Sequence, residues 1–177
     1  MVCTPPQSPK FVRATLRTVQ IRNAQPQDAK AIANLLTQLG YPTTEPEATE
    51  RIETWNATPH AQILVAEQDA EVIGVVGLSA FPHLARAALR ARLGALCVDA
   101  AHRRRGVGAA LVRACEQLAR EWGCDDMEIT GRRARPEAPA FYPALGYEDR
   151  SPLAFRFMRS LQPDGAPSPP PPPAARR

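Results

Sequence analysis

The stretch Leu93–Trp122 reads LGALCVDAAHRRRGVGAALVRACEQLAREW and predicts a strand, a turn and a helix in that order. Its first residues form a short apolar run of strand length that ends at Asp99. After the turn, apolar residues recur at helical spacing, while charged residues fall mostly on the opposite face. The Glu116–Arg120 pair supports this helix, and Gly123 is suited to end it. The apolar positions of the predicted helix are Val107, Leu111, Ala114, Cys115, Leu118 and Trp122.

The turn between strand and helix spans residues 103–109 and has the composition of an anion-binding site. Glycines at positions 106 and 108 remove side chains that would keep a ligand away from the backbone. The first N–H groups of a helix have no partner within it, and the helix dipole adds partial positive charge at the same end. Three consecutive arginines add more. The sequence therefore predicts a phosphate or pyrophosphate site at this turn.

Two common phosphate motifs do not fit the turn. The Walker pattern fails because no Gly-Lys-Ser/Thr follows a four-residue gap, and the dinucleotide fingerprint fails at Leu111, where a glycine or alanine is required. The pattern that fits is Arg-x-x-Gly-x-Gly at Arg103, Gly106 and Gly108, directly after a strand that ends in Val98. This combination resembles the acyl-coenzyme A signature of the GCN5-related N-acetyltransferase (GNAT) family.

Length and composition favour a single globular domain. The chain has 177 residues, of which 44% are hydrophobic, enough for one domain with a full core. Apolar runs stay short of membrane-spanning length, and the N-terminus lacks the apolar core of a signal peptide, so we expect a cytoplasmic protein without a membrane partner. Cys97 and Cys115 occupy positions expected to be buried, and we interpret them as small hydrophobic residues in a reducing compartment. The histidines lack metal-ligand spacing, so no metal is expected.

Charge is distributed unevenly along the chain, whose formal net charge is +4. Residues 86–105 contain six arginines and one acid, whereas residues 40–72 contain seven acids and one arginine. One interpretation is a basic region that faces an anionic cofactor and an acidic region that faces a cationic acceptor. The alternative is that both are solvated faces. A nucleic-acid partner is not expected, because aromatic residues do not interleave with the arginines and no nucleic-acid motif is present.

The two ends of the chain are predicted to lie outside the folded domain. Residues 1–13 and 162–177 together carry ten of the nineteen prolines and little that could be buried. We therefore expect disordered tails at 1–13 and 162–177 around one acetyltransferase-like domain at 14–161. A polyproline ligand for another protein is an alternative interpretation of the second tail.

The elements predicted between the tails indicate a mixed α/β fold. Their order is β-α-α-β-β-β-α-β-α-β, and residues 83–90 are ambiguous between a loop and a helical turn. The predicted strands and helices, apart from those of the central stretch, are Leu16–Ile21, Asn23–Leu39, Glu45–Trp55, Ile63–Ala66, Val72–Leu78, Met127–Thr130, Ala138–Leu145 and Leu153–Phe157. Gly74 and Gly77 lie within one of these strands, where a bulge or close ligand approach is possible.

Two further motifs extend the resemblance to the GNAT family over residues 16–160. Ala138-x-x-Phe141-Tyr142-x-x-Leu145-Gly146-Tyr147 is similar to the family's closing motif. At the front, Ile21-Arg22-x-Ala24 before Asp28, and residues 39–42, match as well. The resemblance implies a mostly antiparallel sheet with splayed central strands and helices on both faces. It also implies acetyl-CoA as the co-substrate.

The resemblance assigns roles to individual residues. The strand backbone would meet the pantetheine arm, the turn would hold the pyrophosphate, and Tyr142 would stand near the cofactor sulfur. A core aromatic is the alternative role for Tyr142. Two departures from the family pattern are Arg135, at a position that is often asparagine, and the lack of a glutamate on the central strand. The expected cofactor-binding residues are Leu96, Cys97, Val98, Arg103, Arg104, Arg105, Gly106, Val107, Gly108 and Ala109.

The implied reaction is direct attack of an acceptor amine on the thioester carbonyl, with Tyr142 donating a proton to the departing thiolate. The backbone N–H of Val98 could stabilise the oxyanion. Glu67, Glu128 and His83 are unranked candidates for the base. The acceptor stays open between a small-molecule amine and a protein amine, as does a homodimer. A non-catalytic acyl-CoA sensor or an interaction module is the alternative function.

Overall fold

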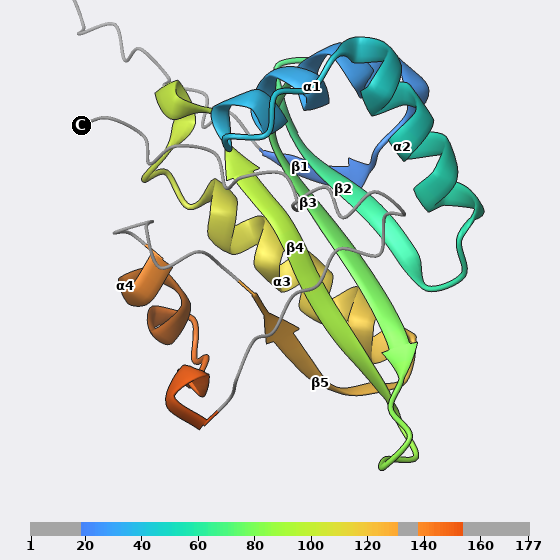
Figure 1. Cartoon of the computed structure of the whole chain (residues 1–177). Helices are drawn as coiled ribbons and strands as arrows, with labels where there is room; N and C mark the ends of the chain where they lie inside the picture. The colour runs from blue at the N-terminus through green and yellow to red at the C-terminus, as the bar shows by residue number, and fades with distance from the viewer. Residues whose placement is uncertain (1–18, 131–137, 154–177) are drawn as a thin grey trace, which may run out of the picture.

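The computed structural model describes residues 19–130 and 138–153, which fold around one five-stranded sheet of order β1-β2-β3-β4-β5 (Figure 1). The strands are β1 Gln20–Asn23, β2 Ala61–Gln68, β3 Glu71–Pro82, β4 Leu89–Val98 and β5 Cys124–Ile129. The α-helices are α1 Ala29–Gln38, α2 Glu45–Ala57, α3 Val107–Glu121 and α4 Ala138–Ala144. Short 3-10 turns lie at Pro26–Asp28, Ala100–His102 and Ser151–Leu153.

The sheet is mostly antiparallel, as expected. Strands β1 to β4 pair antiparallel with their neighbours, and β5 pairs parallel with β4. A parallel pair needs a crossover connection, which α3 supplies. The last pair between β4 and β5 joins Leu93 to Ile129, yet β4 continues to Val98. We call the place where these two strands part, beyond Leu93 and Ile129, the fork.

Helices cover both faces of the sheet. Helices α1 and α2 pack on one face against Ile63, Val65 and Val75. Helix α3 packs on the other face, where its buried side chains meet Val76 and Leu78 (Figure 1). Residues of α4 and the turn after it join the α3 side. The buried stripe of α3 consists of Val107, Leu111, Val112, Cys115 and Ala119.

The two cysteines of the central stretch are buried, as predicted. Cys97 lies in the cluster beneath α1 and α2, and Cys115 lies in the cluster beneath α3. Burial raises the pKa of the Cys115 thiol to about 12, because a thiolate there would lose its hydration. Both residues therefore act as small hydrophobic side chains in the core.

The predicted acidic helix is confirmed as α2 and begins with a capping box. Thr44 precedes it, and its backbone N–H donates to Glu47 Oε2 at 2.7 Å, while Glu47 N–H donates back to Thr44 Oγ1 at 3.5 Å. This exchange satisfies N–H groups that lack partners inside the helix. On the inner face Ala48 and Ile52 are buried, and Trp55 is half-buried.

The helix predicted at Asn23–Leu39 is shorter than expected. Asn23 belongs to β1, and a 3-10 turn at Pro26–Asp28 comes before α1. Arg22 and Asp28 fix this change of direction. The Arg22 guanidinium binds both carboxylate oxygens of Asp28, at 2.7 and 2.9 Å, and Glu67 at 2.6 Å. Burial acts to raise the pKa of Asp28, but hydrogen bonds from Arg22 and from the Gln25 N–H hold it below its usual value. The network joins β1, β2 and the start of α1.

Other boundaries also differ from the prediction. Strand β3 extends to Pro82 and strand β4 begins at Leu89. Residues 83–90, which were ambiguous in the sequence, therefore form mainly the loop that connects these two strands. Leu153 was expected to open a last strand but lies in a 3-10 turn. Residues 154–157 of that strand, residues 16–18, Arg135 and the predicted tails lie outside the described residues. No helix among the described residues is long and apolar enough to cross a membrane.

Candidate functional site

The predicted anion turn lies between the end of β4 and the start of α3. Gly106 is the residue before the helix and adopts φ +84°, a left-handed conformation that glycine enters without steric cost. Arg104 adopts φ +61°, which costs a non-glycine residue about 1 kcal/mol or more. The turn therefore uses glycine for its shape at position 106 and carries local strain at Arg104.

The N-terminus of α3 presents backbone donors at this turn. The first bond into the helix runs from Ala110 N–H to the Gly106 carbonyl at 3.0 Å. The N–H groups of Val107, Gly108 and Ala109 come before it, where helix geometry offers no acceptor, and Gly106 has no side chain to cap them. A helix of 15 residues has a well-developed dipole at this end. The geometry matches that of a phosphate site.

The three arginines of the turn are exposed but not equivalent. Arg103 Nε donates to the Val98 carbonyl at 3.0 Å, which ties this side chain to the end of β4. The side chains of Arg104 and Arg105 project from the turn itself. We therefore expect the flexible positive charge for an anion to come mainly from Arg104 and Arg105.

Gly108 packs against the side chain of Phe141, whereas the sequence predicts only that it leaves room for a ligand. A Cβ atom placed there would lie 3.3 Å from the ring of Phe141, so the glycine allows α4 to pack on the first turn of α3. Tyr142 is the next residue of α4, and its ring packs on that of Phe141. By contrast, a Cβ at Gly106 would meet no atom of the described residues within 4 Å. Gly106 is thus needed for the backbone conformation of the turn, and Gly108 for the packing of α4 on α3.

The turn is also joined to α1, through contacts that the sequence did not indicate. Gln38 is the last residue of α1, and its amide donates to Asp99 Oδ2 at 2.9 Å and accepts from Ala100 N–H at 3.2 Å. Asp99 Oδ1 accepts from Ala101 N–H at 2.9 Å. Hydrogen bonds from Gln38 and from Ala101 lower the pKa of Asp99. The carboxylate therefore fixes the start of the turn.

Strand β4 carries a bulge just beyond the fork. Val75 pairs with Cys97 and Gly77 pairs with Gly94, so β4 holds one residue more than β3 between these pairs. The irregularity includes Ala95, whose φ is +47°. In the described residues, β4 has no strand partner on its β5 side after Leu93, and on that side the Val98 carbonyl accepts from Arg103 Nε. The predicted pantetheine residues Leu96, Cys97 and Val98 lie in this segment.

Tyr142 sits in an aromatic cluster where α3 meets α4. Its ring packs edge to face on Phe141, with 5.0 Å between ring centroids, and on Tyr147 at 6.0 Å. The side chain is half-buried on the α3 side of the sheet. Packing and a role near the cofactor are therefore compatible, and the catalytic role of Tyr142 stays a prediction.

The three candidate bases lie in different parts of the fold. Glu67 belongs to the Arg22 network on β2, and His83 lies in the β3–β4 loop, where its Nδ1 faces Ala85 N–H at 3.3 Å. Glu128 lies on β5 one position before the fork and accepts from Arg92 Nε at 2.5 Å. Of the three, Glu128 is the one that the strand register brings to the fork.

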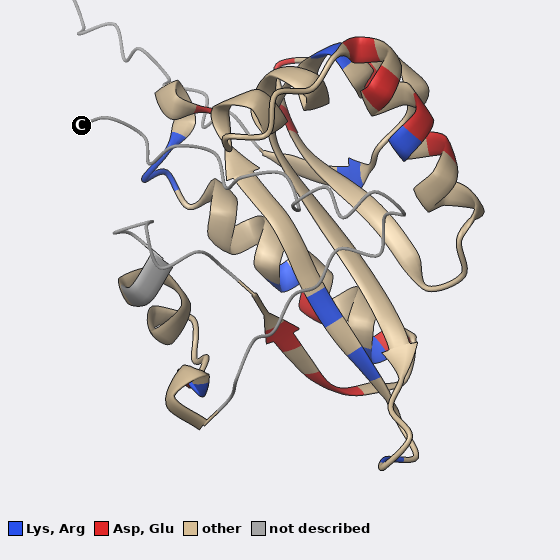
Figure 2. Cartoon of the chain, viewed as in Figure 1, with Lys and Arg blue, Asp and Glu red and all other residues tan. Residues whose placement is uncertain are grey.

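The basic stretch of the sequence separates into two features (Figure 2). Arg86 and Arg90 bind Asp126, at 2.8 and 2.7 Å, and Arg92 binds Glu128. Arg86 also lies 3.7 Å from Asp125, so three arginines of β4 and the loop before it face three acids of β5. The arginines of residues 103–105 form the second feature, at the turn. The acids of α2, namely Glu45, Glu47, Glu50 and Glu53, are exposed along one side of that helix (Figure 2).

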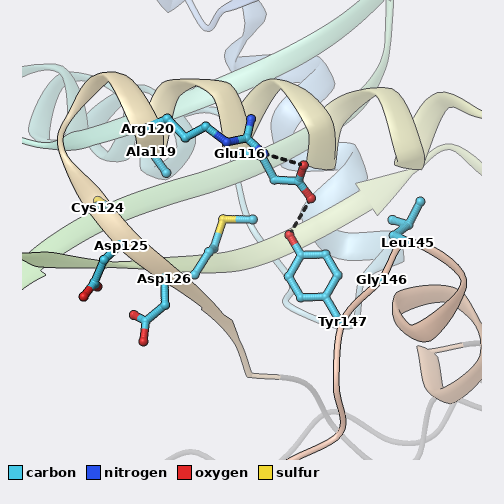
Figure 3. A pocket seen from close by; sticks show the side chains of 10 residues that line it. Glu116, Ala119, Arg120, Cys124, Asp125, Asp126, Leu145, Gly146 and Tyr147 are labelled. Atoms are coloured by element: carbon cyan, nitrogen blue, oxygen red, sulfur yellow. Dashed lines mark hydrogen bonds and ion pairs between the residues drawn. The ribbon is translucent and has the colours of Figure 1, made fainter.

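A cavity of about 270 Å³ lies toward the other end of α3 (Figure 3). The Tyr147 hydroxyl points into it and donates to Glu116 Oε1 at 2.9 Å, and Arg120 lies 3.4 Å from Glu116 Oε2. Burial first, and then the bond to Glu116, raise the pKa of Tyr147. About two and a half helical turns separate Glu116 from the start of α3, so this cavity is apart from the anion turn. No group of described residues is arranged to hold a metal ion.

Comparison with known proteins agrees with the fold. The model of the acetyltransferase (GNAT) family matches residues 29–147, a range that runs from α1 through the turn to Tyr147. The chain belongs to the GNAT acetyltransferase family.

Individual relatives are more distant. The chain is 33% identical to human N-acetyltransferase 8 over 84 residues, which are 48% of this chain and only 37% of that relative. An aminoglycoside N-acetyltransferase solved with CoA is similar in structure, with a TM-score of 0.74 and 19% identity over 85% of this chain and 100% of that one. Glucosamine-6-phosphate N-acetyltransferase from Arabidopsis thaliana has a TM-score of 0.68 and 19% identity, covering 82% and 99%. At these identities the structural matches show the fold.

Proposed function

We propose that this protein transfers the acetyl group of acetyl-CoA to a primary amine by direct attack. The observation that carries the proposal is the junction of β4 and α3. Backbone donors of Val107, Gly108 and Ala109 face outward at the helix start, directly after a strand whose last five residues lie beyond its pairing with β5. Membership of the GNAT family supports the same activity.

The residues present suit acetyl-CoA. The open N-terminus of α3, with Arg104 and Arg105 beside it, provides hydrogen-bond donors and positive charge for the pyrophosphate. The β4 backbone from Leu96 to Val98 provides polar groups for the amide-containing pantetheine arm. Acetyl-CoA supplies the acyl group, and the chain's own residues bind and orient it.

The proposed reaction needs a proton donor for the leaving group. The amine nitrogen attacks the thioester carbonyl carbon, the carbon–sulfur bond breaks, and the sulfur departs as a thiolate. Phenols in water keep their proton at neutral pH, so Tyr142 can protonate this thiolate. The attacking nitrogen loses its proton to solvent. A backbone N–H of β4, such as that of Val98, can stabilise the oxyanion.

The proposed acceptor is the amine of a small molecule or of a protein. An acidic side of α2, with Glu45, Glu50 and Glu53 exposed, supports a cationic acceptor. The extent of the domain, residues 14–161, and a cytoplasmic location stay predictions.

The test is release of free thiol from acetyl-CoA in the presence of primary amines. Reversing the charge of the turn by Arg104→Glu with Arg105→Glu should raise the KM for acetyl-CoA at least tenfold, because two cationic side chains near the pyrophosphate become anionic. Arg113→Glu makes the same change at an exposed position on α3 and is the matched control. Equal KM values for the double variant and the control would contradict the proposed cofactor site.

A further inference from the structure

Gly94 on β4 is a glycine that neither the backbone nor the packing requires. Its φ lies outside the left-handed region, which the bulge instead places at Ala95. A Cβ atom at Gly94 would meet no described atom within 4 Å. Glycine in a strand costs about 0.5–1 kcal/mol relative to alanine and is found at bulges and where a ligand or another backbone comes close. Gly94 borders the bulge, but its own φ is open to any residue, which favours close approach as the reason for glycine.

The other glycines near the site are already in contact with side chains. A Cβ at Gly77, the cross-strand partner of Gly94, would lie 2.8 Å from the ring of Trp55. A Cβ at Gly74 would lie 3.1 Å from Leu111, and Gly108 faces Phe141. Gly94 is thus the strand glycine of the described residues whose space is open.

The open space lies on the face that carries α2. Gly94 and Gly77 are directly paired and therefore point to the same side, which is the side where the α2 residue Trp55 covers Gly77. The Trp55 ring does not come within 4 Å of a Cβ placed at Gly94. The α3 face at this level is filled, since Leu93 is fully buried there.

A charged pair borders the other side of this space. Arg92 precedes Gly94 by two residues and therefore points to the same face of the sheet. Its side chain is 50% exposed. Its guanidinium lies 4.8 Å from the Phe81 ring centroid. Both Nε and Nη2 of Arg92 bind Glu128 Oε1, at 2.5 Å. Glu128 Oε2 lies 3.8 Å from Arg90, longer than a hydrogen bond, which leaves it able to accept from a ligand.

From these positions, and on the basis of the proposed function, we propose that the acceptor amine enters over Gly94. We call the space over Gly94, between Trp55 on the β3 side and the Arg92–Glu128 pair on the β5 side, the open strip. The β4 backbone at 95–98, where we place the thioester, follows Gly94 directly. The open strip suits an unbranched alkyl diamine, whose methylenes pass the Trp55 ring. One nitrogen, as the ammonium, can donate to Glu128 Oε2, and the other attacks the thioester as the neutral amine. Gly94 determines how bulky an acceptor can be.

The test is a series of side chains at position 94 with acetyl-CoA and 1,4-diaminobutane. Gly94→Ala, Gly94→Val and Gly94→Leu fill the strip progressively, and because the space is open none of them should lower the thermal midpoint. We expect kcat/KM for the amine to fall in steps, by about tenfold or more for leucine. The Kd of acetyl-CoA and the thiol release without amine should stay within twofold of wild type. Gln62→Leu, on β2 away from the fork, is the control and should keep the wild-type kcat/KM.

Four results would overturn the inference. They are wild-type amine turnover in Gly94→Leu, weakening of acetyl-CoA binding in step with side-chain size, destabilisation by Gly94→Ala, and no amine-dependent thiol release by a wild-type protein that binds acetyl-CoA. The second would assign the space to the cofactor arm. Absence of acetyl-CoA binding by the wild-type protein would instead contradict the proposed function itself, so the two failures are distinguishable.

Discussion

Gly77 and Gly108 each face an aromatic ring that leaves little room for a side chain: a Cβ would lie 2.8 Å from Trp55 at Gly77 and 3.3 Å from Phe141 at Gly108. Gly106 is needed for its backbone conformation, and Gly94 for neither reason. The sequence motif includes only Gly106 and Gly108 and treats them alike. At the scale of single residues, the structure thus shows two different roles: Gly106 shapes the anion turn, and Gly108 allows α4 to pack on α3.

Tyr142 can be tested at the same scale with a substitution that keeps its ring. Tyr142→Phe retains the contacts with Phe141 and Tyr147 and removes only the hydroxyl. If the phenol protonates the leaving thiolate, kcat should fall by about 10²–10⁴-fold, the usual contribution of a general acid, while the Kd of acetyl-CoA changes little. Steady-state kinetics and titration calorimetry measure these two quantities.

A packing residue would behave differently. An unchanged kcat, with chemistry shown to be the slow step, would remove Tyr142 from the mechanism. A weaker Kd with normal kcat would limit the hydroxyl to ground-state binding of the cofactor.

Elements were predicted well where their apolar residues follow a simple period. In α2, Ala48 and Ile52 are buried as predicted. In α3 the prediction was right for Val107, Leu111 and Cys115 and wrong for part of the stripe, where Val112 and Ala119 are buried and Ala114, Leu118 and Trp122 are only half-buried. Strand β4 was predicted too short because its outer end carries the charged residues Arg90 and Arg92. These side chains are stabilised by acids of β5, 36 residues away in the chain, which local periodicity cannot reveal.

The candidate site shows the same limit. The anion turn could be predicted because its arginines, glycines and helix start are contiguous. The link from Gln38 to Asp99 joins residues 61 apart, and the seat of Phe141 on Gly108 joins α4 to α3. Such contacts depend on how elements pack, so no local pattern in the sequence indicates them.

The Arg22 network offers a prediction about how elements are held together. Asp28→Asn removes the buried carboxylate from Arg22, which is half-buried and keeps Glu67, and should lower the free energy of unfolding by about 2 kcal/mol at pH 7 through the loss of charged hydrogen bonds. Because the pKa of Asp28 is held below 3.8 in the fold, its contribution is complete above about pH 4 and is lost as the pH falls further. The difference between wild type and variant should therefore shrink below pH 4.

Urea unfolding at several pH values measures this difference. Glu148→Gln is the control, since its partner Arg150 and Glu148 itself are both largely exposed and such pairs contribute at most about 1 kcal/mol. A loss in Asp28→Asn no larger than in the control would show that the network is not important for stability.

For the molecule as a whole, the sheet separates two sides with different proposed tasks. The anion turn, Phe141 and Tyr142 lie with α3, whereas the open strip over Gly94 lies with α2. At the fork, β4 and β5 are no longer paired, so the sheet does not separate the two sides there. In this account the cofactor and the acceptor approach the β4 backbone from different sides and meet at residues 95–98.

The central claim is that the junction of β4 and α3 binds the pyrophosphate of acetyl-CoA. Titration calorimetry can compare acetyl-CoA with S-acetylpantetheine, which keeps the thioester and the arm but lacks the pyrophosphate and the nucleotide. Charge-assisted hydrogen bonds contribute about 1.5–3 kcal/mol each, so the loss of two or more predicts binding at least about a hundredfold weaker. The Arg104→Glu, Arg105→Glu double variant should lose most of this preference. Equal affinity of the wild-type protein for the two compounds, or a preference unchanged in the double variant, would contradict the account.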